Sequence, residues 1–369
     1  MKPKIIIDTL SLLGNLSGIG RYTYEVSKIL SKNSSYQWSF FYGYISDKLI
    51  APNDQPTTKS LRNLLIQNKF IKATIRKILF FLAGLFSPQY ALYWQPNFIP
   101  LKSIKTKKIV TTVHDFSWEL YAKFQPQERV KYFKDNFYQQ ITKCDHIITG
   151  SYFTKNEIIS RTNMSEEKIS VIYHGIDHTL FYPSKEHTKE RQKYILAVGS
   201  IEPRKNLKNL LYAYAQYDDA FKDEYHLYLV GDKGWENSDI WHLIEALGSW
   251  VHYTGYISDS QLVNIYRNAS LFVYPSLYEG FGIPPLEAMA CGTAVIVSNT
   301  SSLPEICGDA AYYIDPLNIA SIADGIQHIL NNDLLREELI QKGLQHAQSF
   351  TWEKSAKEHS SVFEKVLSQ

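Results

Sequence analysis

Residues 274–292 read YPSLYEGFGIPPLEAMACG, and this stretch decides the fold class that we expect. An apolar run of the kind found in buried parallel strands ends near Tyr274, and a loop with two glycines follows it. An apolar segment then begins with two prolines, which are tolerated in the first helical turn because the N–H groups there lack partners. Gly292 stands where glycine commonly ends a helix. The stretch therefore predicts a strand, a loop and a helix in direct succession.

Two glutamates of this stretch are candidate ligand-binding residues. Glu279 lies on the loop, and Glu287 lies about one turn into the predicted helix. The free N–H groups and the positive dipole end of such a helix favour a diphosphate or a sugar hydroxyl. Glu287 suits a vicinal diol such as that of a ribose, Glu279 suits a sugar hydroxyl, and Gly280 and Gly282 let the backbone approach a ligand closely. From these residues alone, a solvated pair of glutamates flanking a structural turn is an equally good interpretation.

Strand-like and helical segments alternate along the rest of the chain. A β-branched run at residues 4–8 is followed by a glycine-bearing loop (13–20) and a helical segment (21–30) with one apolar face. Further strands are expected at 38–44, 91–94, 108–113, 146–149 and 169–173, and then at 194–199, 226–230, 251–253, 271–274 and 294–297. This alternation predicts parallel sheets with helices on both faces.

The chain divides at a polar, aperiodic segment, residues 183–191, which we take as the linker. Its 369 residues suit two domains, each of roughly 150–200 residues. We expect an α/β protein with a doubly wound, Rossmann-like domain over 1–182 and a second one over 183–352. The pattern at 352–367 predicts an exposed amphipathic helix. Ligands of such folds lie at the carboxyl ends of the strands, so the site is expected in the cleft between the domains.

Composition narrows the class of protein. With 44% hydrophobic and 21% charged residues the chain is typical of a soluble globular protein. Three cysteines without a CxxC pair (Cys144, Cys291, Cys307) favour neither a disulfide framework nor a zinc site, and they indicate a reducing compartment. No signal peptide is expected, because the first residues run directly into a strand. The longest apolar run, residues 78–86, is shorter than the roughly 20 residues of a membrane-spanning helix.

Charge is distributed unevenly. Residues 1–180 contain 24 Lys and Arg against 13 Asp and Glu, whereas the remainder contains 15 and 24. The basic half indicates an anionic partner, for which a membrane surface, an anionic lipid and nucleic acid are all candidates. Residues 59–86 combine six cations with Leu, Ile and Phe, which predicts a basic amphipathic segment on an anionic leaflet. An ordinary helix packed on the sheet with its lysines outward is the alternative.

The order of motifs resembles that of family 4 glycosyltransferases, which have the GT-B fold. Glu279 and Glu287, seven residues apart, look like the family's E-x7-E signature. Six other stretches are similar to family motifs: VGSIEPRKNL (198–207), GYI (255–257), PE (304–305), VIYHGID (171–177), VHD (113–115) and FTW (350–352). The resemblance covers nearly the whole chain. It implies two Rossmann-like domains facing a central cleft and a C-terminal helix, residues 353–369, that crosses back to the first domain.

The resemblance also implies roles for individual residues. The implied catalytic residues are His114, Arg204, Lys205 and Glu279. His114 would contact the transferred sugar. Arg204 and Lys205 would neutralise the diphosphate. Ser200 stands where relatives often have an Arg, so part of the diphosphate contact is in doubt. The implied donor-binding residues are Gly18, Gly20, Gly199, Tyr256, Ile257, Gly280, Phe281, Gly282, Ile283 and Glu287. Arg21 and Asp115 are the implied acceptor contacts, and no Asp-x-Asp metal motif ends a strand.

The expected activity is retaining, metal-independent transfer of a hexose from a nucleotide diphosphate sugar, without a further cofactor. HDFSWE (114–119) resembles the same stretch in family members that use GDP-mannose. We therefore expect GDP-mannose as the donor, with UDP-sugars as the next candidates. The acceptor would be a saccharide or a lipid-linked saccharide, at a cytoplasmic site on the inner face of the cell membrane, with no nucleic-acid partner. Three alternatives remain: a nucleotide-sugar epimerase, a non-enzymatic anionic-ligand-binding protein, and a dehydrogenase, which would need a third glycine after Gly18 and Gly20.

Overall fold

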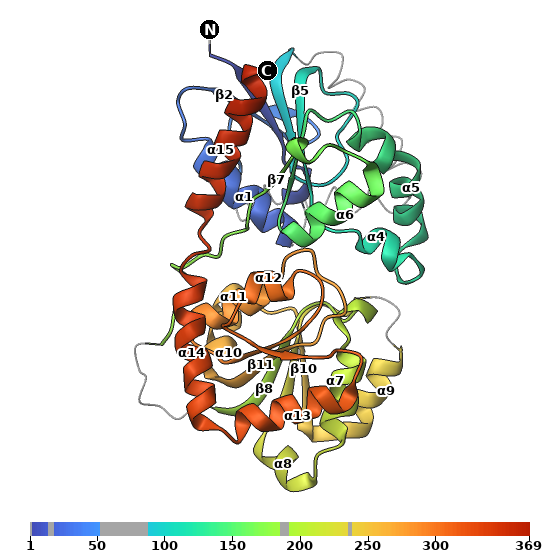
Figure 1. The fold of residues 1–369 in the computed structure, drawn as a ribbon, viewed down its shortest axis with the longest axis vertical. Coiled ribbons are helices and arrows are strands. Elements are labelled where there is room, and N and C mark those ends of the chain that lie inside the picture. The colour runs from blue at the N-terminus through green and yellow to red at the C-terminus, as the bar shows by residue number, and fades with distance from the viewer. Residues whose placement is uncertain (1, 14–17, 52–87, 185–191, 235–237) are drawn as a thin grey trace, which may run out of the picture.

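The structure is a computed structural model, and it describes residues 2–13, 18–51, 88–184, 192–234 and 238–369. Two sheets lie one above the other along the long axis of the molecule (Figure 1). The first belongs to the N-terminal half and the second to the C-terminal half. The basic segment at 59–86, for which membrane contact is expected, lies outside the described residues.

Among the described residues, seven strands form the first sheet in the order β3-β2-β1-β4-β5-β6-β7. Their bounds are β1 Lys4–Asp8, β2 Gln37–Phe41, β3 Ile45–Ser46, β4 Tyr90–Gln95, β5 Thr106–Val113, β6 His146–Thr149 and β7 Ile169–Val171. Neighbouring strands are parallel except β2 and β3, which pair antiparallel at one edge. The α-helices that the structure describes in this half are α1 Gly18–Leu30, α4 Ser117–Leu120, α5 Gln127–Ile141 and α6 Tyr152–Thr162.

In the described part of the C-terminal half, six parallel strands form the second sheet in the order β10-β9-β8-β11-β12-β13. Their bounds are β8 Gln192–Val198, β9 His226–Val230, β10 Val251–Gly255, β11 Ala269–Tyr274, β12 Val295–Ser298 and β13 Tyr312–Ile314. The helices around it are α7 Leu207–Ala215, α8 Asp219–Glu224, α9 Ser238–Leu247, α10 Asp259–Asn268, α11 Ile283–Ala290, α12 Leu303–Cys307, α13 Ile319–Leu330 and α14 Asp333–Ala347.

Uninterrupted apolar strands follow from burial of both faces of each sheet. In β11, Leu271 and Val273 pack in one core while Phe272 and Tyr274 pack in the core on the opposite face. Successive side chains of a strand point to opposite faces, so a strand covered on both sides needs apolar residues at every position. The apolar runs therefore predicted the strands of both sheets except β3 and β13, which lie where no strand was expected.

The start of α1, the end of β2 and the exposure of α15 differ from those expected. Helix α1 begins at Gly18 rather than at residue 21, so Gly18 and Gly20 lie in its first turn and not in a loop. Strand β2 ends at Phe41, because the chain turns at Gly43, where φ is 87°. The C-terminal helix, α15 (Trp352–Ser368), is only partly exposed. Its buried positions share one stripe, which packs against α1.

The C-terminal helix crosses back to the first half of the molecule, as expected. Figure 1 shows α15 beside α1 in the upper half, while the preceding α14 lies in the lower half. The chain thus passes between the halves twice, and the two passages touch where Ile176 pairs with Thr351. Gly175 has no room for a side chain there, because a Cβ would lie 2.3 Å from the backbone nitrogen of Trp352.

Candidate active site

The two predicted cations come from a single 3-10 turn that follows β8. Pro203–Lys205 form this turn, and Asn206 ends it in the left-handed conformation, with φ 58°. The Asn206 amide donates hydrogen bonds to the carbonyl oxygens of Pro275 (3.1 Å) and Pro316 (2.7 Å). The turn is therefore fixed against the loop after β11, which carries Glu279.

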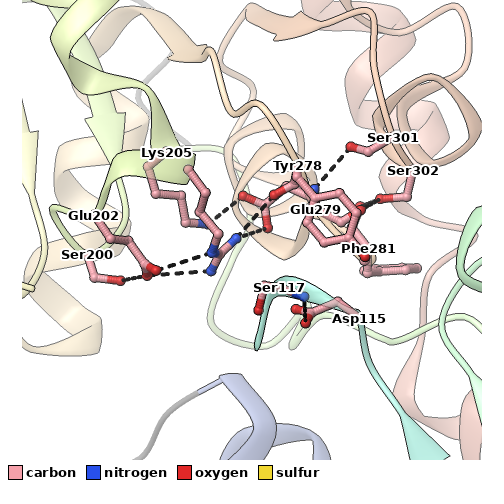
Figure 2. A network of polar contacts seen from close by, with 12 residues as sticks. Asp115, Ser117, Ser200, Glu202, Lys205, Tyr278, Glu279, Phe281, Ser301 and Ser302 are labelled. Atoms are coloured by element: carbon pink, nitrogen blue, oxygen red, sulfur yellow. Dashed lines mark hydrogen bonds and ion pairs between the residues drawn. The ribbon is translucent and has the colours of Figure 1, made fainter. Parts of the chain in front are cut away.

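Arg204, Lys205 and Glu279 form one ionic cluster. Figure 2 shows Lys205 and Glu279 of this cluster. Lys205 Nζ lies 2.6 Å from Glu279 Oε1 and also 2.6 Å from the Tyr274 hydroxyl. Arg204 Nη1 donates to Glu279 Oε2 at 2.9 Å. Burial alone would raise the pKa of Glu279, but the Arg204 and Lys205 cations outweigh it and lower that pKa to about 2. Glu279 is therefore a carboxylate at neutral pH.

The loop that carries Glu279 is held against the first half of the molecule by its neighbours. The Tyr278 hydroxyl accepts a hydrogen bond from the Phe116 N–H (2.8 Å) and donates one to Glu157 Oε2 (2.6 Å). The Ser151 hydroxyl donates to the Gly280 carbonyl at 2.7 Å. A Cβ on Gly280 would lie 1.9 Å from the His114 carbonyl oxygen. The two halves thus meet with backbone against backbone at this loop.

His114 and Asp115 follow β5 and face that seam, and Figure 2 shows Asp115 across from the loop of Tyr278 and Phe281. His114 Nε2 lies 2.8 Å from the carbonyl oxygen of Pro96, which can only accept a hydrogen bond. Nε2 therefore carries the hydrogen, and Nδ1 is left as an acceptor in the neutral ring. Burial lowers the pKa of His114, which keeps the imidazole neutral.

Glu287 occupies a different environment from Glu279. Its carboxylate accepts a hydrogen bond from the Tyr266 hydroxyl at 3.2 Å. Burial raises its pKa to about 7, although Arg21 and the Tyr266 contact oppose the rise. Arg21 itself donates through Nη2 to both oxygens of Asp259, at 2.7 and 2.8 Å, and so joins α1 to α10 across the two halves.

The other predicted donor-binding residues lie at strand ends or helix starts. Gly199 directly follows β8, and Tyr256 and Ile257 directly follow β10, with Tyr256 exposed and Ile257 packed against the core. Phe281 is buried with its ring centroid 4.6 Å from that of His174. Gly282 and Ile283 are the N-cap and first residue of α11. Gly292 follows that helix with φ 77°, as expected of a glycine that ends a helix.

Several polar residues of the site had no role assigned from the sequence. Glu202 contacts Arg204, Tyr274 contacts Lys205, and Tyr278 joins the two halves. Glu305 accepts hydrogen bonds from the N–H groups of Tyr152 (2.8 Å) and Phe153 (3.0 Å) at the start of α6. Their positions within or beside recognised motifs were a signal, but the partners of Tyr274, Tyr278 and Glu305 lie far away in the sequence.

Within the described ranges, no group of three or more His, Cys, Asp and Glu residues is placed to hold a metal ion. In the same part of the chain, no helix has the length and apolar character needed to cross a bilayer. The three cysteines are all free and buried.

Comparison with known proteins places this site in a family. Residues 180–346 match the family model described as glycosyl transferases group 1, and residues 56–180 match that of Glycosyltransferase Family 4. The chain is 33% identical to the O-antigen chain mannosyltransferase B of Escherichia coli, over 95% of this chain and 96% of that protein. This chain belongs to glycosyltransferase family 4.

Other relatives of this glycosyltransferase agree with the assignment. It is 30% identical to the O-antigen chain mannosyltransferase RfbU of Salmonella typhimurium, over 64% of this chain and 69% of that protein. Its fold matches that of a sucrose-phosphate synthase from Thermosynechococcus elongatus, with a TM-score of 0.75 at 20% identity over 99% of both chains. It also matches Anabaena HepE in complex with UDP and glucose, with a TM-score of 0.70 at 17% identity over 98% of this chain and 100% of that one. The GT-B fold expected from the motifs is confirmed.

Proposed function

We propose that this glycosyltransferase moves mannose from GDP-mannose to a saccharide or lipid-linked saccharide, with retention of configuration and without a metal, in the synthesis of a cell-surface polysaccharide. The observation that carries the proposal is the buried cluster of Arg204, Lys205 and Glu279, which lies beside the seam where Gly280 meets His114. The names of the E. coli and Salmonella relatives support mannose and a polysaccharide product.

The donor would bind between the two glutamates. Arg204 and Lys205 both contact the Glu279 carboxylate, and they would hold the diphosphate. They would also stabilise the negative charge that develops on the diphosphate as the bond to the sugar breaks. Glu287 is ionised above about pH 7 and would then accept hydrogen bonds from the two ribose hydroxyls. His114, neutral and with Nδ1 as an acceptor, would orient a hydroxyl of the transferred sugar.

The state of Glu279 supports a same-face substitution. A covalent route needs a carboxylate nucleophile, in glycosidases about 5 Å from its partner. Glu279 is bound by two cations that lower its pKa to about 2, which makes it a weak nucleophile and a weak base. In the proposed reaction the bond from the anomeric carbon to the phosphate oxygen breaks. The acceptor oxygen bonds to that carbon on the same face, and its proton goes to the leaving phosphate.

One set of measurements tests this function. Thermal-shift titration with GDP, UDP, ADP and their sugar conjugates identifies the base, and transfer in excess EDTA tests metal independence. The proton NMR coupling of the anomeric hydrogen in the product reports retention or inversion. Isomerised donor released without any acceptor would instead identify an epimerase, and binding without any turnover would identify a non-enzymatic binding protein.

Glu287→Gln should weaken nucleoside diphosphate binding about 10- to 100-fold, because charge-assisted hydrogen bonds to the ribose are lost. Stability should not fall. The folded protein holds a proton on Glu287 between pH 4.5 and about 7 that the unfolded chain releases, so this carboxyl lowers stability as pH rises through that window. Calorimetric titration at pH 6 and pH 8, with melting curves, measures both effects.

The control for this variant is Glu245→Gln, which neutralises an exposed glutamate on α9. It should bind GDP and UDP as the unchanged protein does. Affinity of the unchanged protein should rise from pH 6 to pH 8, and this rise should be absent in Glu287→Gln. Equal affinity of Glu287→Gln and the unchanged protein would refute the ribose role.

The inner face of the cell membrane is the proposed location. The uneven charge of the first half supports it, with 24 Lys and Arg against 13 Asp and Glu over residues 1–180. Flotation with vesicles that contain 30 mol% anionic lipid should recover the protein at low salt and release it as salt is raised. Equal recovery with neutral vesicles, or none with anionic ones, would refute this location.

A further inference from the structure

We propose that Glu202 is a positioning residue that acts through Arg204, holding the guanidinium in place and competing with the diphosphate for it so that the nucleotide product is released. The inference rests on the proposed function of Arg204 in diphosphate binding. Figure 2 shows Glu202 and Glu279 on either side of the cationic groups, with Ser200 beyond Glu202.

Two side chains, Arg204 and Ser200, hold the Glu202 carboxylate in place. Its Oε2 accepts from Arg204 Nε at 3.2 Å, and its Oε1 lies 3.5 Å from Arg204 Nη2. The Ser200 hydroxyl donates to the same Oε1 at 2.7 Å. The side chain of Glu202 is 12% exposed and that of Arg204 is 16% exposed, so solvent weakens their attraction little. Ser200 thus holds the Glu202 carboxylate at the side of the guanidinium.

The edge of the guanidinium that Glu202 covers is the one that a phosphate would need. Arg204 Nη1 already contacts Glu279 and the Tyr278 carbonyl, at 2.9 and 3.3 Å. The Nε and Nη2 edge presents two parallel N–H groups, the geometry with which arginine grips phosphate. Glu202 lies along that edge, so a diphosphate that binds Arg204 through two hydrogen bonds must displace it.

Glu202 is also the easier of the two carboxylates to displace. Glu279 makes contacts of 2.6 Å with Lys205 and 2.9 Å with Arg204. The contacts of Glu202 with Arg204 are longer, at 3.2 and 3.5 Å, and Glu202 also accepts a hydrogen bond from the Ser200 hydroxyl. Two cations and two carboxylates balance in the donor-free cluster. A diphosphate must therefore displace Glu202 from Arg204. Its affinity is lower than it would be if Arg204 and Lys205 had no competing carboxylate, and it dissociates faster.

Glu202→Gln tests this competition because it keeps the size of the side chain and removes its charge. Calorimetric titration should show GDP and UDP binding about tenfold tighter, the scale of one partly buried charge interaction. Steady-state kcat should fall, and stopped-flow measurement should show slower nucleotide release. A residue needed only to order the turn would give the opposite change, weaker binding together with a lower melting temperature.

Two further variants keep the test decisive. Ser200→Ala removes the hydroxyl that holds Glu202 and should tighten GDP binding in the same direction by a smaller factor, which also covers failure of Glu202→Gln to fold. Glu224→Gln makes the same change of net charge at an exposed pair with Lys193 (2.8 Å) and should leave binding unchanged. Equal or weaker binding by Glu202→Gln overturns the inference alone. If the unchanged protein binds neither GDP nor UDP, the proposed function fails with it.

Discussion

Gly280→Ala is expected to reduce kcat/KM for sugar transfer at least 100-fold while leaving both sheets folded. The added Cβ would lie 1.9 Å from the His114 carbonyl oxygen and 2.9 Å from Asp115 Cβ, and the first of these is backbone that cannot rotate away. The loop of Glu279 must then separate from the first half of the molecule. A misplacement of about 1 Å between reacting groups can cost about 100-fold in rate.

A measurement of nucleotide binding distinguishes this loss of transfer rate from a general loss of folded protein. Arg204, Lys205, Glu279 and Glu287 all belong to the second half, so Gly280→Ala should still bind GDP or UDP. Gly248→Ala is the control, because its Cβ meets no atom within 4 Å. With φ at 59° it should lose about 1 kcal/mol of stability and keep its transfer rate. Transfer at the normal rate by Gly280→Ala would show that the two halves need not meet at this loop.

Lys205→Met is expected to lower kcat on the order of 1,000-fold, the upper range for loss of one group that stabilises transition-state charge. It should also lower the free energy of unfolding by about 3 kcal/mol, because a buried carboxylate loses one of its partners. Glu279, whose pKa is about 2 in the fold, contributes stability that is present above its unfolded pKa and is lost as pH falls toward 2. Without Lys205 part of that stability should be missing at neutral pH.

A second substitution distinguishes the loss of stability from the loss of rate. Lys205→Met combined with Glu279→Gln removes both partners of this ion pair, so the melting temperature should recover while kcat stays low. Lys208→Met, which removes an exposed lysine paired with Asp239 at 2.8 Å, should change neither. Urea unfolding and initial-rate assays measure these outcomes. Normal transfer by Lys205→Met would remove this lysine from the proposed mechanism.

The parts of the site that were predicted well are those built from residues close together in the sequence. The spacing of Glu279 and Glu287 placed one on a loop and the other in a helix, and the structure confirms this for the segment before and within α11. The apolar runs located strands such as β8 and β11, because a strand covered on both faces shows its burial in consecutive residues. The start of α1 was predicted wrongly, since glycine in a first helical turn resembles a loop.

The partners of the charged groups were not predictable in the same way. Arg21 was expected to contact an acceptor, and the structure pairs it with Asp259, 238 residues away. Tyr278 reaches Glu157 across 121 residues, and no local pattern in either segment indicates the other. Glu202 lies two residues from Arg204, but whether the two would touch depended on how the turn after β8 folds.

Most strands and helices, the family and the charged residues at the strand ends were predictable from the amino-acid sequence, because period, side-chain chemistry and motif spacing are local properties. The different states of the two glutamates became visible in the folded protein, where two cations hold Glu279, Glu287 has a raised pKa, and Gly280 lies against His114. Desolvation and ion pairing depend on which distant side chains surround a group. That is set by the packing of the two sheets and the crossing of α15, and not by neighbours along the chain.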